Sequence, residues 1–572
     1  MTSLSVSAEV SVAASPADLP VTQDALDVPP PTPDFGPAAR LTCRECGTSY
    51  SLGAAYACVE CFGPLEVGYE FVDVTRARIE AGPNSMWRYS CLLPVASFAG
   101  SEPNLNPGLT KLVRADNLAR ALGMTGTLWV KDDSGNPTHS FKDRVVAVAQ
   151  SAARRLGLTT IACASTGNLA NAVAAAAARA GPSSVVVIPS NLEDGKVLST
   201  ATYGGTLLAV NGNYDDVNRL CSELVGDPLT ADWGFVNVNL RPYYAEGSKT
   251  VGFEIAEQLG WRLPAQVVAP IASGSLLTKV DKAFREFIEL GLVAESPYRM
   301  FGAQATGCSP VSAAFRAGHD VVRPVRPDTI AKSLAIGNPA DGPYALDAVR
   351  RTGGAIEDVS DVEIVEGIRL LAETEGIFAE TAGGVVVATL RKLLAAGLLD
   401  PSAETVILNT GDGLKTLDAI AGQVGPTATI AADIDAVTAV LARTADSRTA
   451  AAALARGTQF ATASEPESAV ASAGAGPASA SASAGAGPAS ASADAELPGF
   501  GLGAGPASAS ADASVSADAE LPGFGLGAGP ASADASVSAD AELPGFGAGI
   551  GAGAGSPEQP ALASPSTPAT GK

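Results

Sequence analysis

Short apolar runs alternate with longer amphipathic stretches from Leu41 to about Gly422. Short apolar runs predict buried strands, whereas apolar residues at helical spacing predict helices. The predicted strands are Leu128–Val130, Ile161–Ala164, Ser184–Pro189, Thr206–Val210, Phe235–Val238, Val267–Ile271, Met300–Gln304 and Thr405–Asn409. The predicted helices are Arg144–Leu156, Leu169–Arg179, Tyr214–Leu224, Gly247–Leu259, Leu276–Leu290, Asp361–Glu375 and Ala382–Ala396. Strands interleaved with helices are typical of parallel sheets, so we predict an α/β fold.

The two ends of the chain lack this pattern. Residues 1–39 are rich in Pro, Ala and Asp, and we expect a disordered leader there. After Arg456 the chain is almost entirely Ala, Ser, Gly and Pro, and we expect a disordered acidic tail over 457–572. The tail repeats Asp-Ala-Glu-Leu-Pro-Gly-Phe-Gly at 494–501, 518–525 and 540–547. One Leu and one Phe per copy are too few to bury a face; the alternative is that the repeated Leu-Pro-Gly-Phe docks a partner.

The rest of the chain divides into three segments. We expect a ribbon-like segment with paired cysteines at residues 40–70 and the main α/β body at residues 71–422. We expect a smaller subdomain of the body at about 150–245. Residues 423–456 form an extension, in which 426–443 would dock as a final strand and helix.

Charge excludes some classes of partner. The chain has 60 acidic against 37 basic residues, a net charge of −23, and the tail carries ten of these net negative charges. Binding to nucleic acid depends on Lys and Arg that neutralise phosphates, so we expect no nucleic-acid partner. The first basic residue is Arg40, and no apolar run is long enough to span a bilayer, so we expect a cytoplasmic protein without a membrane partner.

Four of the eight cysteines form two pairs, Cys43-Arg-Glu-Cys46 and Cys58-Val-Glu-Cys61, with eleven residues between the pairs. Two such knuckles place four thiolates tetrahedrally around zinc, in a closed structural site. The alternatives are a ribbon that keeps its shape without metal, or free thiols. A nucleic-acid ribbon is disfavoured because the loop contains a single base, Arg44.

A lysine lies in a turn before a predicted helix, in Asn136-Pro-Thr-His-Ser-Phe-Lys-Asp-Arg144. Ser140 followed by Asp143 is typical of a helix N-cap with an acid in the first turn. Lys142 would then lie close to Arg144 and to the positive end of the helix dipole. These surroundings lower the pKa of an amine, as a Schiff-base lysine requires. The alternative is a surface lysine at a helix start.

Three more turns follow predicted strands. Ala164-Ser-Thr-Gly-Asn168 offers an amide, and Pro270-Ile-Ala-Ser-Gly-Ser-Leu-Leu277 offers hydroxyls and N–H groups that could wrap a phosphate. Asn409-Thr-Gly-Asp-Gly413 offers the neutral hydroxyl of Thr410. Each turn alone is also explained as an ordinary capping or glycine-rich turn. In an open α/β sheet, however, ligands bind at the edge where such turns lie.

Together the four turns supply what pyridoxal 5′-phosphate needs: an amine for its aldehyde, a partner for its phenolic oxygen, a phosphate cup and a partner for its ring nitrogen. These motifs occur in the order found in fold-type II pyridoxal-phosphate enzymes, and the chain resembles the threonine synthase family over about residues 41 to 422. The resemblance includes the cysteine ribbon and three further motifs, Tyr243-Tyr-Ala-Glu-Gly-Ser-Lys-Thr250, Ala335-Ile-Gly-Asn-Pro339 and Glu380-Thr-Ala-Gly-Gly384.

The resemblance implies roles for individual residues. Lys142 would bind the cofactor covalently and act as the catalytic base, Asn168 would contact the ring hydroxyl, and Thr410 would face the pyridine nitrogen. The residues expected to cup the cofactor phosphate are Ala272, Ser273, Gly274, Ser275 and Leu276. The turn residues expected to bind the substrate carboxylate through N–H groups are Ser165, Thr166 and Gly167.

The resemblance also implies two α/β domains with open twisted sheets, the cofactor between them, and a homodimer. The implied reaction converts O-phospho-L-homoserine and water to L-threonine and phosphate. A small-molecule amino-acid substrate is therefore expected.

Two positions depart from the family pattern. His139 stands where many relatives have Gly; we expect a packing or hydrogen-bonding role, with a proton relay as the alternative. Tyr244 stands where other threonine synthases have an Arg that grips the substrate phosphate. Arg241 or Lys249 would have to substitute for that Arg.

Two other functions remain open from the sequence. One is another lyase of the same fold, such as a threonine or serine dehydratase or an enzyme similar to cysteate synthase. The other, of a different class, is a catalytically silent scaffold that binds the cofactor and recruits partners through its tail.

Overall fold

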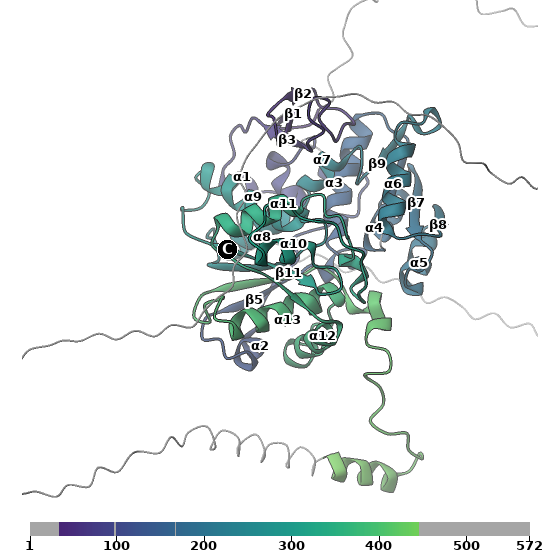
Figure 1. Cartoon of the computed structure of the whole chain (residues 1–572), viewed down its shortest axis with the longest axis vertical. Coiled ribbons are helices and arrows are strands. Elements are labelled where there is room, and N and C mark those ends of the chain that lie inside the picture. Colours follow the sequence, from purple (N-terminus) through teal and green to yellow (C-terminus); the bar gives the residue numbers. More distant parts are fainter. Residues whose placement is uncertain (1–33, 97–98, 166, 445–572) are drawn as a thin grey trace, which may run out of the picture. The chain divides into compact units, whose positions relative to one another are not determined.

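The computed structural model describes residues 34–96, 99–165 and 167–444. Their strands form three sheets, with helices packed around them (Figure 1). The predicted tail and its repeats lie outside the described residues, as does the predicted leader up to residue 33. The last six residues of the predicted leader are described, and Phe35 is buried and stacks on the ring of Tyr243.

The largest sheet has six strands in the order β12-β11-β10-β13-β5-β4. These strands are β4 Lys111–Arg114, β5 Leu128–Asp132, β10 Gln266–Pro270, β11 Arg299–Ala305, β12 Ile356–Val359 and β13 Thr405–Asn409. All neighbours pair in parallel except β4, which runs antiparallel to β5 at the edge. The prediction of an α/β fold with parallel sheets is confirmed.

Alternate residues of this sheet face two different cores. Val267 and Ala269 belong to one apolar cluster and Val268, between them, belongs to another. The helices that cover the first face are α8 Lys249–Gln258, α9 Ser275–Glu289 and α11 Gly342–Arg351, and those on the second face are α2 Asp116–Ala121, α12 Asp361–Glu375 and α13 Thr381–Ala395. Burial on both faces explains why these strands are apolar runs rather than alternating patterns.

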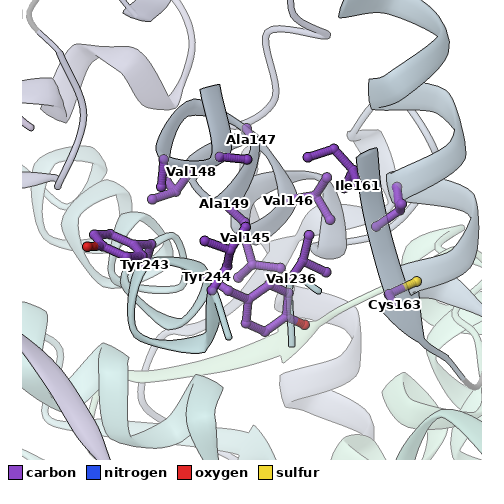
Figure 2. Close-up of a cluster of buried hydrophobic side chains, with 14 of the residues drawn as sticks. Val145, Val146, Ala147, Val148, Ala149, Ile161, Cys163, Val236, Tyr243 and Tyr244 are labelled. Carbon is purple, nitrogen blue, oxygen red and sulfur yellow. The ribbon is translucent and has the colours of Figure 1, made fainter. Parts of the chain in front are cut away.

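A second sheet has four parallel strands in the order β8-β7-β6-β9. The strands are β6 Thr160–Ala164, β7 Ser183–Pro189, β8 Thr206–Val210 and β9 Trp233–Phe235. The helices around it are α3 Lys142–Arg155, α4 Asn168–Ala180, α5 Asp194–Ala201 and α6 Tyr214–Leu224. Figure 2 shows valines of α3 packed with Ile161 and Cys163 of β6. All four strands lie within the predicted subdomain of about 150–245, although its boundaries stay a prediction.

β9 ends before the predicted strand Phe235–Val238 does. The reason lies in Asn237, whose side-chain amide takes the place of the strand backbone. It donates to the carbonyl oxygen of Ala164 at 3.0 Å and accepts from the N–H of Ala164 at 3.3 Å.

The predicted ribbon is a three-stranded antiparallel sheet, formed by β1 Ala38–Cys43, β2 Ser49–Tyr50 and β3 Leu65–Tyr69. β3 fixes it to the body through buried charges. Glu66 accepts from Lys279 of α9, and the hydroxyl of Tyr69 donates to Glu246 at 2.6 Å. Burial alone would raise the pKa of Glu66, but Lys279 and a second lysine, Lys282, hold it well below its usual value.

The remaining elements connect these sheets. They are α1 Arg76–Glu80, α7 Arg241–Glu246, α10 Pro310–Arg316 and the short 3-10 helices Met86–Leu92, Ala99–Ser101, Asp133–Gly135, Pro228–Thr230, Lys332–Leu334 and Gly413–Ala419. Residues 434–444 form an exposed helix, but residues 425–433 form no strand, contrary to the expected docking. Ile430 is the only large apolar residue of 425–433, so a strand there would bury little apolar surface.

A buried ion-pair cluster joins the two larger sheets. Arg144 of α3 is fully buried and donates to Asp133 at 2.7 and 2.8 Å and to Glu254 of α8 at 2.8 Å. Lys131 of β5 also donates to Glu254, at 2.6 Å. Burial would raise the pKa of Glu254, but Arg144 and Lys131 hold it at about 2.

We predict that Arg144→Met lowers the free energy of unfolding by about 3–5 kcal/mol, because it leaves Asp133 and Glu254 buried without their partner. Urea titration followed by tryptophan fluorescence measures the change. The matched control is Arg219→Met, which removes an exposed pair with Glu223 and should cost less than about 1 kcal/mol. Equal loss in the two variants would contradict the importance of the cluster.

Candidate active site

The four predicted turns meet around one small cavity of about 50 Å³. From the predicted turns it is lined by Lys142, Asn168, Ala272, Ser273, Gly274, Ser275, Leu276 and Thr410. A larger cavity of about 590 Å³ shares Lys142, Ala272, Ser273 and Ser275 with it, and adds Ser165 and Arg241. Residues that are far apart in the sequence thus form one continuous site.

Lys142 is the first residue of α3. Its Nζ donates to the hydroxyl of Tyr244 at 3.1 Å and lies 4.5 Å from the centre of the Phe141 ring. Figure 2 shows Tyr244 below the cluster of α3 valines, with its hydroxyl directed away from that of Tyr243. Burial lowers the pKa of Lys142 to about 8, although the carboxylate of Glu380 opposes the shift.

The predicted cap of this helix is wrong. The hydroxyl of Ser140 has no partner among the described residues, and Phe141 precedes the helix without a side-chain cap. Asp143 instead accepts from the N–H and hydroxyl of Thr138, both at 2.7 Å. Arg144 is engaged in its own ion pairs, so desolvation rather than this neighbour lowers the pKa of Lys142.

Asn168 is buried at the start of α4, where its amide donates to both oxygens of Glu380 at 3.0 and 2.8 Å. The side-chain oxygen of Asn168 has no partner among the described residues. Thr410 lies next to this pair, with its hydroxyl 3.5 Å from Glu380, while its carbonyl oxygen accepts from the N–H of Phe141. An anion, an amide and a hydroxyl therefore face the same cavity as the amine of Lys142.

The turn Ala272–Leu276 ends at the N-terminus of the 15-residue helix α9. Gly274 has a φ of +96°, and a Cβ atom there would lie 2.6 Å from the carbonyl oxygen of Asp341. Only glycine suits this position. Three hydroxyls that line the cavity, those of Ser248, Ser275 and Ser333, are buried without a partner among the described residues. Unpaired hydroxyls at a helix N-terminus suit a phosphate.

The turn predicted to bind the substrate carboxylate uses its N–H groups within the fold. Ser165 lines the larger cavity, but its N–H donates to Val187 of β7, and its hydroxyl accepts from Gly167 and Ala170. The N–H groups of Ser165 and Gly167 are thus already used within the fold, and Thr166 lies outside the described residues. Gly167 has a φ of +120°, and a Cβ atom there would lie 2.1 Å from the Lys196 side chain.

Of the two residues predicted to bind the substrate phosphate, one lines a cavity and the other does not. Arg241 lines the larger cavity and pairs with Asp341 at 2.8 Å. Lys249 is fully buried away from both cavities and pairs with Glu246 and Glu286, both at 2.9 Å. The expectation for Lys249 is therefore corrected, because its charge is already neutralised inside the body.

His139 does not lie in the cavities. It is exposed and has a φ of +61°, the conformation that glycine adopts without strain. The exposure of His139 gives no support to the expected packing role or to the proton relay.

Two residues of the site were missed as individual candidates. Glu380 was noted only within its motif, and Tyr244 only as the replacement of an Arg. A carboxylate just before a small, apolar helix start was the available signal for Glu380. Nothing in the sequence indicates that the hydroxyl of Tyr244 accepts from Lys142.

The four paired cysteines form a candidate metal centre in the ribbon. Their sulfur atoms all lie within 4.8 Å of one another, with Cys43 and Cys61 at 3.4 Å and Cys46 and Cys58 at 3.6 Å. Tetrahedral zinc with thiolate bonds of about 2.3 Å places sulfurs about 3.8 Å apart. The cluster is therefore compatible with zinc in a closed site.

Comparison with known proteins defines the class. The model of the pyridoxal-phosphate dependent enzyme family matches residues 104–411, and the chain belongs to this family. The site described above fits the cofactor, because the unpaired serine hydroxyls suit its phosphate and the amine of Lys142 suits its aldehyde.

Within this family, the chain is similar to several threonine synthases. Threonine synthase of Methanocaldococcus jannaschii is 37% identical over 383 residues, which cover 66% of this chain and 93% of that protein. Threonine synthase of Methanosarcina acetivorans is also 37% identical, over 69% of this chain and 97% of that protein. Among solved structures, an L-serine ammonia-lyase from Rhizomucor miehei has 23% identity and a TM-score of 0.45, over 53% of this chain and 94% of that one.

We predict that the rate at which the cofactor-free protein recombines with pyridoxal phosphate rises with pH, with a midpoint near 8. The neutral amine of Lys142 is the nucleophile, and burial lowers its pKa to about 8. Stopped-flow absorbance measures this rate. Glu380→Gln should move the midpoint to lower pH, because the carboxylate favours the protonated amine. A midpoint near the ordinary lysine value of 10.5 would contradict the assignment.

Proposed function

We propose that this chain is a threonine synthase, which converts O-phospho-L-homoserine and water to L-threonine and phosphate. The observation that carries the proposal is the identity of 37% with two threonine synthases over nearly their whole length. The convergence of the four turns on one cavity supports a working site rather than a silent scaffold.

Pyridoxal phosphate, when bound, supplies the electron sink for carbanion chemistry at the substrate. In our proposal Lys142 holds its aldehyde carbon, and the turn Ala272–Leu276 with Ser248 and Ser333 holds its phosphate. Asn168 and Thr410 position the ring, while Glu380 holds the amide of Asn168 in place.

Lys142 also carries the proton transfers of the proposed reaction. Its amine would take the Cα proton of the substrate and return a proton at a later stage. A pKa of about 8 suits this work, since both protonation states are populated near neutral pH. The hydroxyl of Tyr244, 3.1 Å away, holds the amine at the border of the two cavities.

The larger cavity is proposed as the substrate site. Ser165 and Gly167, at the start of α4, would hold the substrate carboxylate near the positive end of that helix, with Thr166 between them. Because their N–H groups are already engaged, this turn would have to exchange its own hydrogen bonds for those to the substrate. Arg241, which lines the same cavity, is the proposed partner of the substrate phosphate.

We propose a homodimer, as the family resemblance implies, and a cytoplasmic location, as the sequence analysis predicts. In the described part of the chain, no helix has both the length and the apolar character needed to cross a bilayer.

The decisive assay follows phosphate release from O-phospho-L-homoserine together with threonine formation. Equal amounts of both products support the proposal. Ammonia and a keto acid from threonine or serine would instead identify a dehydratase, and no turnover with the cofactor bound would favour a scaffold. Lys142→Ala should abolish both products, whereas Lys111→Ala, at an exposed edge of β4, should leave them unchanged.

We predict that Arg241→Ala raises the KM for O-phospho-L-homoserine by about 10- to 100-fold, the effect of losing a charge-assisted hydrogen bond to phosphate. Steady-state kinetics measure it. Arg241→Lys should recover part of the loss, since lysine keeps the charge but not the planar fork. The matched control is Arg219→Ala, which removes an arginine of the same cavity that is mostly exposed and paired with Glu223. An unchanged KM in Arg241→Ala would rule out this residue as the phosphate partner.

A further inference from the structure

A residue in or beside each cysteine knuckle of the ribbon contacts the larger cavity or a residue that lines it. Arg44 lies inside the first pair, between Cys43 and Cys46, and Tyr56 lies two residues before Cys58 of the second. Tyr56 lines the larger cavity and packs against the apolar cluster of the four-stranded sheet. The ribbon is thus part of the wall of the substrate pocket.

The first knuckle reaches the pocket through a chain of charges. Arg44 lies 3.8 Å from one oxygen of Asp341, and Arg241 pairs with the other oxygen at 2.8 Å. The negative charge of Asp341 is the largest influence on the pKa of Arg241 and raises it. The ion pair with Asp341 therefore stabilises the charged guanidinium of Arg241 in this position. The position of Arg241 therefore depends on where Asp341 is held.

Asp341 is held from two sides. Its N–H donates to the carbonyl oxygen of Ser273 at 2.7 Å, in the turn that forms the proposed phosphate cup. On the other side, Arg44 stacks over the ring of Tyr344 in α11, with its guanidinium carbon 3.6 Å from the ring centre. The hydroxyl of Tyr344 in turn donates to Glu45, the other residue inside the first knuckle.

The base of the ribbon is fixed independently of the cysteines. β3 is anchored on the body by Glu66 and Tyr69, which contact Lys279 and Glu246. Cys43 and Cys58 are buried in the apolar core, and the first knuckle contacts the body through Arg44, which pairs with Asp341, and Glu45, which accepts from Tyr344. The direction of Arg44 also depends on the conformation of its turn, which four thiolates bound to one ion would fix.

We propose that zinc bound by Cys43, Cys46, Cys58 and Cys61 acts on the substrate site: through Arg44 and Asp341 it positions Arg241 for the phosphate group of the substrate. Arg44 and Asp341 are positioning residues in this scheme, since neither is required to touch the cofactor. The inference rests on the proposed function for the identity of the substrate. The metal centre is a structural site with a consequence for affinity rather than for the chemical step.

The test compares zinc-loaded and zinc-free protein. Cys46→Ser and wild type treated with a zinc chelator are each measured for zinc content, cofactor absorbance, kcat, and KM for O-phospho-L-homoserine. We expect about one zinc per chain in the wild type. Loss of zinc should raise KM about tenfold, the effect of loosening one charge-assisted hydrogen bond, with cofactor absorbance kept and kcat within about twofold. Zinc added back to the chelated wild type should restore KM, a result that does not depend on whether Cys46→Ser folds.

The coupling residue is tested by Arg44→Gln, which should raise KM about as much as zinc loss while zinc content stays unchanged. Arg44→Lys should recover part of the affinity. The matched control is Arg40→Gln, an arginine of the same ribbon whose exposed side chain pairs with Glu70, and its KM should equal that of the wild type.

The affinity for inorganic phosphate, read from the change in cofactor absorbance, separates the two proposals. A wild type that makes no threonine contradicts the proposed function, yet weaker phosphate binding by Arg44→Gln would still support the coupling. The inference is overturned if zinc-free protein keeps the KM and phosphate affinity of the wild type, if Arg44→Gln does so, or if the wild type holds no zinc and takes up none.

Discussion

The buried ion pairs of Arg144 are the constraint on which the site depends. Its guanidinium lies without solvent contact between Asp133, which follows β5, and Glu254 of α8, so α3 is locked to the six-stranded sheet at its first turn. Lys142 is two residues earlier in the same turn. Charges taken out of water are stable only when their partners are well placed, so this cluster tolerates little displacement. The backbone position of Lys142 is therefore fixed in part by charged residues that do not line the smaller cavity.

Several polar side chains of the pocket have hydrogen-bonding atoms that find no partner among the described residues. Glu380 uses both oxygens on the amide of Asn168, which leaves the other end of that amide unpaired. The hydroxyls of Ser248, Ser275 and Ser333 are likewise buried without a partner among the described residues. Unpaired polar groups are costly in a folded protein, and their concentration in one place marks where a ligand completes the structure. Tyr244 adds a hydrogen bond that restrains the free amine of Lys142.

The fold could be predicted from sequence because strands buried on both faces stand out as apolar runs, and glycine-containing turns follow several of them. Elements whose signal is weaker were missed: the strands β4 and β12, and the helices α1, α2, α5, α7, α10 and α11. β9 was misplaced because the side chain of Asn237 imitates backbone pairing. In the site, motifs located the turns correctly, but the cause of the low pKa of Lys142, the use of Ser165 within its own turn and the burial of Lys249 depend on tertiary contacts that no local pattern encodes.

α3 has a further mechanical consequence. Its first turn is bound to the six-stranded sheet, while the rest of the helix packs on the four-stranded sheet with β6 and α4. If the four-stranded sheet rotates relative to the six-stranded sheet, α3 would rotate with it about its own first turn. Displacement is smallest at a pivot, so Lys142 would move little while the start of α4 moves relative to it. A pivot at this turn would let the larger cavity change shape with little displacement of the amine.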